Sequence, residues 1–184
     1  MKFVDIFAEE LDYREQLFSV VYANEKGNYG SSEYEKLLDL WTNVEYLRNY
    51  AKNNNVKHIN DFVRKRLRDA EKIEDFIDEI LENGEPLDRY FHQLNNNETG
   101  VKVLSLRKGK TSKIDGLRLY AIKIDTNCFL ITGGAIKMSL KNDDHPDTRE
   151  EMKKIENVKS YLQTEGIADE DSFYELLIDM ENEK

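Results

Sequence analysis

The hydrophobic pattern of the chain changes type along its length. Residues 3–7 alternate in a two-residue period, and residues 17–22 are rich in β-branched and aromatic side chains, so both predict short strands. From residue 34 onward, apolar side chains recur every three or four positions, which is typical of helices. After residue 100 the pattern returns to strands, and near residue 147 it returns to helices.

Two helices are predicted in the N-terminal half. The first covers residues 34–52, where Ser31 or Ser32 can cap its first turn by accepting hydrogen bonds from backbone amides. The second covers residues 60–83 and ends at Gly84, because glycine readily adopts the left-handed conformation that closes a helix.

The C-terminal half predicts short strands and then two helices. The strands cover residues 101–106, 117–124, 128–132 and 135–138, with Gly133 and Gly134 interrupting the last two. One helix begins at Asp147 or Thr148, and another covers residues 171–180. Helices grouped before consecutive strands predict an α+β fold with an antiparallel sheet. We therefore expect one domain over residues 1–184, in which an N-terminal hairpin and a C-terminal meander pack with the helix pair and the C-terminal helices.

Composition excludes several classes of protein. The single Cys128 excludes a disulfide framework and a cysteine-based zinc site, and it fits a cytoplasmic protein. No apolar run is long enough to span a membrane, and the N-terminus does not resemble a signal peptide. The three histidines are scattered, so neither a metal nor a cofactor is predicted. Adjacent acids such as Glu150 and Glu151 are expected on the solvated surface.

Charge is distributed unevenly in this acidic chain of net charge −10. Residues 101–141 carry nine basic and two acidic side chains, whereas residues 1–100 carry 13 and 21, and residues 142–184 carry 5 and 14. A basic island in an acidic protein marks a place where an anionic partner can bind. The alternative is that acidic helices pack around this segment and neutralise it.

The basic island also contains candidates for phosphodiester chemistry. The alternation of residues 117–124 places Arg118 and Tyr120 on one strand face, opposite Leu117 and Leu119. Cations beside a tyrosine can hold a phosphodiester, stabilise its transition state and supply a hydroxyl for proton transfer. In the alternative interpretation, Tyr120 packs under the N-terminal helices and Arg118 pairs with one of their acids.

The segment VKVLSLRKGKTSKIDGLRLYAIKIDTNCFLITGGAIKMSLK, residues 101–141, resembles the sheet of the RelE/ParE toxin superfamily, particularly its phage-derived HigB-like branch. The shared features are a lysine-rich strand connection, an arginine-led strand, a short acidic turn and an apolar strand with a lysine-containing tail. A polar loop with Pro146 and a charged helix follow. The resemblance covers roughly residues 60–160 and includes the β-α-α-β-β-β order.

This resemblance implies a ribosome-dependent mRNA endonuclease that cleaves by internal attack of the 2′-hydroxyl without a metal. Similarity places Arg118 and Lys110 as clamps on the phosphate and its transition state, and Tyr120 as proton acceptor. The basic residues left for contacts with RNA are Arg107, Lys108, Lys113, Lys137 and Lys141. A paired antitoxin protein is expected to cover the basic island, and the ribosome with its mRNA is the expected target.

The chain also departs from that family, whose members are much shorter and basic overall. An acidic body repels ribosomal RNA, so a second hypothesis is a non-catalytic protein-interaction module on a former toxin fold. The acidic C-terminal helix can also be read as a built-in antitoxin that screens the basic strands.

Overall fold

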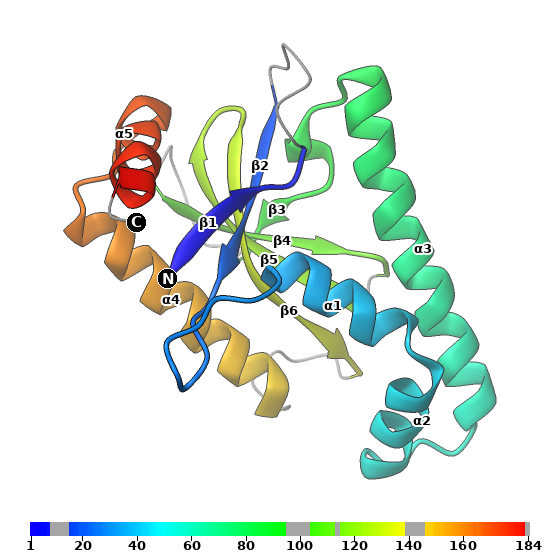
Figure 1. The fold of residues 1–184 in the computed structure, drawn as a ribbon. Coiled ribbons are helices and arrows are strands. Elements are labelled where there is room, and N and C mark those ends of the chain that lie inside the picture. Colours follow the sequence, from blue (N-terminus) through cyan, green and yellow to red (C-terminus); the bar gives the residue numbers. More distant parts are fainter. Residues whose placement is uncertain (8–14, 95–103, 113–114, 139–145, 183–184) are drawn as a thin grey trace.

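The computed structural model describes residues 1–7, 15–94, 104–112, 115–138 and 146–182 (Figure 1). Its strands are β1 (Lys2–Asp5), β2 (Gln16–Val21), β3 (His92–Gln93), β4 (Ser105–Lys110), β5 (Gly116–Asp125) and β6 (Cys128–Lys137). Its α-helices are α1 (Glu33–Thr42), α2 (Val44–Asn53), α3 (Ile59–Asn83), α4 (Pro146–Thr164) and α5 (Glu170–Asn182), and a short 3-10 helix covers Leu87–Arg89.

The six strands form one mixed sheet in the order β1-β2-β6-β5-β4-β3. The β1–β2 hairpin and the β4–β5–β6 meander are each antiparallel, so the predicted α+β fold with these two units is confirmed. The two units join through β2 and β6, which run parallel. The predicted antiparallel pairing therefore holds within each unit, whereas the contact between the two units is parallel. Parallel neighbours need a long crossover connection, and here α1–α3 and the other strands supply it.

Helices cover both faces of the sheet (Figure 1). On one face, Leu117, Leu119 and Ala121 of β5 pack into a core with residues of α1, α2 and α3. On the other, Tyr120 and Ile122 pack into a second core with residues of α4 and α5. We call these the α1–α3 face and the α4–α5 face. The predicted alternation of β5 is confirmed, because its two sets of side chains enter different cores.

The predicted helix over residues 34–52 is divided at Asn43. This residue has an extended backbone, and its side chain accepts a hydrogen bond from the Tyr46 amide, so it ends α1 and caps α2. Ser32 caps α1 as predicted, in a reciprocal arrangement with Glu35. An asparagine that caps a new helix explains why a continuous apolar stripe does not produce one continuous helix.

Strand boundaries also differ from the prediction. Of the strand predicted over residues 101–106, residues 101–103 lie outside the described residues, and 105–106 begin β4, Ser105–Lys110. Arg107, Lys108 and Lys110 therefore belong to a strand and not to a connection. Gly133 and Gly134 do not interrupt β6, which is continuous through them. A Cβ at Gly133 would collide with the Glu151 carboxylate. The two glycines therefore allow other elements to pack closely against β6.

Candidate functional site

Basic side chains from three strands gather on the α4–α5 face. The register pairs Lys108 with Tyr120, Lys110 with Arg118, and Gly116 with Lys137. Directly paired residues share a face of the sheet, and neighbouring pairs lie within reach of long side chains. We refer to Lys108, Lys110, Arg118 and Lys137 as the cationic cluster. The structure thus brings together four of the predicted site cations, with Tyr120 beside them.

The members of the cationic cluster affect one another electrostatically. Burial lowers the pKa of Lys108, and the nearby positive charges of Lys110, Lys137 and Arg118 lower it further. Burial also lowers the pKa of Lys137, with additional repulsion from Arg118 and Lys110. Groups that repel one another in this way gain stability when an anion binds among them. The cluster is therefore suited to binding a negatively charged ligand.

The four cations differ in how accessible they are. Lys110 is exposed, and Lys108 and Lys137 are half-buried. Arg118 is only 3% exposed, and its Nη1 donates to the Leu117 carbonyl at 3.0 Å. The Lys108 Nζ donates to the Leu94 carbonyl at 2.8 Å. The three lysines are therefore at least partly accessible from solvent, whereas Arg118 is buried beneath the surface.

Tyr120 lies on the α4–α5 face and not under the N-terminal helices, as one alternative held. Its side chain is buried, and burial raises its pKa to about 12, a shift that Arg118 partly opposes. A phenol with this pKa is protonated at neutral pH. Tyr120 can therefore donate a hydrogen bond, but it is poorly suited to the predicted role of proton acceptor.

Arg107 points to the opposite side of the sheet. It pairs with Ala121, a member of the α1–α3 face. Its Nη1 lies 3.9 Å from Asp88 Oδ1, and Lys123 contacts the same carboxylate. The predicted RNA-binding residue Arg107 is thus separated from the cationic cluster by the sheet itself. Lys113 and Lys141 lie outside the described residues.

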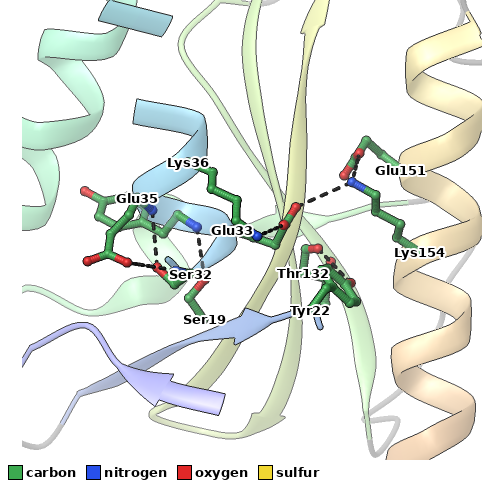
Figure 2. A network of polar contacts seen from close by, with 10 residues as sticks. Ser19, Tyr22, Ser32, Glu33, Glu35, Lys36, Thr132, Glu151 and Lys154 are labelled. Carbon is green, nitrogen blue, oxygen red and sulfur yellow. Dashed lines mark hydrogen bonds and ion pairs between the residues drawn. The ribbon is translucent and has the colours of Figure 1, made fainter. Parts of the chain in front are cut away.

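Polar side chains from other elements form hydrogen bonds with the backbone at the outer edge of β6 (Figure 2). Among the described residues, β2 pairs with Cys128–Ile131, and no strand pairs with the rest of this edge of β6. The Tyr22 hydroxyl donates to the Thr132 carbonyl at 3.0 Å, and the Gly134 amide donates to Glu151. These bonds satisfy backbone groups that an open edge would leave available for another strand.

Glu151 is the acid that sequence reasoning missed, since it was expected on the surface. It is 9% exposed and lies between Gly133 and Lys154, whose Nζ is 2.6 Å from Oε1. Lys154 also reaches Glu33 of α1 at 3.4 Å, which ties α4 to α1 around the sheet edge (Figure 2). Burial raises the pKa of Glu151, and Lys154 opposes that rise. Gly133, which faces the Glu151 carboxylate, was the available signal in the sequence, because a glycine leaves space for a buried carboxylate.

The acidic helix α5 lies over a different part of the same face. Its Phe173 is fully buried, with ring centroids 5.5 Å from Phe3 and 5.1 Å from Phe18. Gln16 donates to Glu170 at 2.8 Å, and the Glu170 amide donates to Asp125. α5 therefore completes the second core. The hypothesis that its acids screen the cationic cluster stays a prediction.

Among the described residues, no group of three or more His, Cys, Asp or Glu side chains is arranged to hold a metal ion. Cys128 is buried, and burial raises the pKa of its thiol, so it is unreactive as a nucleophile. Within the same ranges, none of the helices combines the length and the apolar character that crossing a bilayer requires.

No protein-family model matches the chain, and the searches of curated proteins and of solved structures found no significant match. The resemblance to the RelE/ParE superfamily therefore stays a prediction.

Proposed function

We propose that this protein binds RNA through the cationic cluster and acts as a toxin-like protein of a toxin–antitoxin system. The observation that carries the proposal is the convergence of Lys108, Lys110, Arg118 and Lys137 from three adjacent strands onto one face. RNA is a linear array of phosphates, and cations on neighbouring strands contact successive phosphates without reading bases.

The distribution of charge favours a local contact over general adhesion. The whole chain carries a net charge of −10, so most of its surface repels a nucleic acid. RNA binds favourably only where its phosphates reach the cationic cluster, because they reduce the repulsion among the positive charges of the cluster. Binding of this kind weakens steeply as salt concentration rises, because counterions are released from the phosphates.

Cleavage is the catalytic extension of this proposal. In metal-independent cleavage, the 2′-hydroxyl loses its proton to a solvent water, and its oxygen attacks phosphorus to form a 2′,3′-cyclic phosphate. The bond to the 5′-oxygen breaks, and the departing oxygen takes up a proton. Lys110 and Arg118 would stabilise the extra negative charge on the phosphate in the transition state. Tyr120, protonated at neutral pH, fits the donor side of this reaction and not the acceptor side.

A second candidate function is RNA binding or protein interaction without cleavage. It is favoured by the burial of Arg118 and Tyr120, which are 3% and 1% exposed. Groups buried to that extent do not touch a phosphodiester unless the surrounding surface opens.

The test combines binding with activity in cells. We expect Lys110→Gln to lower the affinity for single-stranded RNA several-fold, while the exposed Lys26→Gln on the 24–28 turn leaves it unchanged. Inducible expression in a bacterial host should arrest translation, and Arg118→Ala or Tyr120→Phe should relieve the arrest. RNA binding without arrest would favour the second candidate. Equal binding by Lys110→Gln and wild type would refute the RNA-binding proposal.

A further inference from the structure

A second group of basic side chains surrounds the turn between α2 and α3. Two adjoining hollows of about 590 and 670 Å³ open there, and both are lined by Lys57, His58, Asp61 and Arg64. The cations that line one or both hollows are Arg48, Lys52, Lys57, Arg64, Lys65 and Arg68. All six are exposed. We call these six residues the turn patch.

Acids neutralise the turn patch only in part. Asp61 and Asp115 are the two carboxylates that line the hollows. The Arg64 Nη2 lies 3.0 Å from Asp61 Oδ1, and the Lys65 Nζ lies 3.6 Å from Asp115 Oδ2. All four side chains are well exposed. Exposed ion pairs of this kind are weak and readily exchange partners. The turn patch is thus a locally positive surface on an acidic protein.

The turn patch adjoins the cationic cluster at the beginning of β5. Asp115 lines one hollow and directly precedes Gly116, which is the cross-strand partner of Lys137. The buried Arg66 guanidinium, 3.5 Å from Asp115, lies close enough to repel Arg118. Asp115 and Arg66 therefore place the turn patch near the end of the sheet at which β5 begins and Lys137 lies.

The hollow offers charge but no aromatic surface for a nucleotide base. Phe62 lines it, yet Tyr50 stacks on this ring with centroids 6.2 Å apart, and the Arg66 guanidinium lies over it at 5.2 Å. Base stacking needs an open ring face. The chemistry that remains is contact between exposed cations and phosphates, which does not depend on base sequence.

We infer that the turn patch is a second phosphate-binding surface for the same RNA strand that occupies the cationic cluster. This inference rests on the proposed function and extends it, because it defines the substrate as a strand long enough to reach both surfaces. His58, at the N-terminus of the 25-residue helix α3, makes no capping hydrogen bond with its side chain. The positive end of that helix therefore adds to the attraction for phosphate.

The test compares two lengths of RNA. Wild type, a turn-patch variant (Arg48→Gln, Lys52→Gln, Lys57→Gln) and a control variant (Lys26→Gln, Lys153→Gln, Lys159→Gln) are titrated into strands of about 4 and about 16 nucleotides. The two variants change the net charge equally, and the control lysines lie outside both basic surfaces. Circular dichroism confirms that each variant is folded.

We expect the turn-patch variant to bind the longer strand about tenfold more weakly, with a slope of log affinity against log salt that is smaller by about 2. Its affinity for the short strand should equal that of wild type. The control variant should bind both strands as wild type does. An unchanged affinity of the turn-patch variant for the longer strand overturns the inference, even if Lys110→Gln still weakens binding.

Two further outcomes separate the inference from the proposed function. If wild type binds neither strand, or if Lys110→Gln has no effect on either, the proposed function fails. If the turn-patch variant loses affinity for polyglutamate but not for RNA, the surface binds an acidic protein, and the inference is wrong.

Discussion

The two faces of the central sheet use their basic residues in opposite ways. On the α1–α3 face, Arg107 and Lys123 of adjacent strands share the carboxylate of Asp88. On the α4–α5 face, Lys110 and Arg118 of the same two strands lie near Lys108 and Lys137. Burial lowers the pKa of both of these lysines, and the charges of Lys110 and Arg118 lower it further. The strands are the same and only the side-chain direction differs. Alternation along the strands therefore decides which basic residues of one segment lie together on a face.

The largest expected effect concerns the stability of the α1–α3 face. Trp41 is 1% exposed and belongs to the core beneath α1. Trp41→Ala should lower the free energy of unfolding by about 3–5 kcal/mol, since it removes a large buried ring and leaves a cavity. Denaturant unfolding measures this loss. Affinity for RNA, corrected for the folded fraction, should not change, and a specific loss of RNA binding would contradict the division between the faces.

A smaller loss is expected at Gly109, where the Tyr90 ring lies against the backbone of β4. Tyr90 is held in turn by Phe76, with ring centroids 4.5 Å apart. Gly109→Ala should cost about 1–3 kcal/mol of unfolding free energy, because the added methyl group displaces this ring. Gly30→Ala is the matched control, since open space surrounds that position. Equal stability of the two variants would show that Tyr90 moves without cost.

On the α4–α5 face, we expect Arg118→Met to leave stability unchanged or to raise it by about 1 kcal/mol. Replacing a buried cation with an apolar side chain of similar length removes a desolvation cost and the repulsion from Arg66. Thermal unfolding at neutral pH measures the change. A loss on the order of 2 kcal/mol or more would mean that Arg118 is primarily structural.

The smallest effect is a dependence of stability on pH at Glu151. Its pKa is raised in the folded protein, so folding favours the protonated form. That contribution is present below the ordinary pKa of 4.5 and is lost as pH rises through the raised value. Glu151→Gln should reduce the decline in unfolding free energy over this window. The exposed Glu156→Gln should retain the wild-type profile, and identical profiles for both variants would contradict the assignment.

Much of the fold follows from local pattern, and the failures have identifiable causes. The faces of β5 could be predicted, because alternation depends only on the strand itself. The parallel pairing of β2 with β6 could not, since it joins segments more than a hundred residues apart. The break between α1 and α2 could not be predicted either, because it depends on a hydrogen bond from the Tyr46 backbone amide to the Asn43 side chain.

The site was predicted in part for similar reasons. The basic island predicts Lys108, Lys110, Arg118 and Lys137 together with Arg107, and the strand register shows that Arg107 lies on the opposite face. The turn patch is not visible when charge is summed over the whole N-terminal segment. Residues 1–100 are acidic as a whole, but residues 48–72 carry eight basic and three acidic side chains. A shorter window of charge would have revealed it.

The most direct test of the account compares two double variants from opposite faces in RNA binding. Lys110→Gln with Lys137→Gln removes two charges from the cationic cluster, and Arg107→Gln with Lys123→Gln removes two from the α1–α3 face. We predict that the first pair lowers affinity for single-stranded RNA about tenfold and reduces the salt slope by about 1.4, whereas the second pair changes neither. Equal losses from both pairs would show that net charge alone governs binding and would contradict the account.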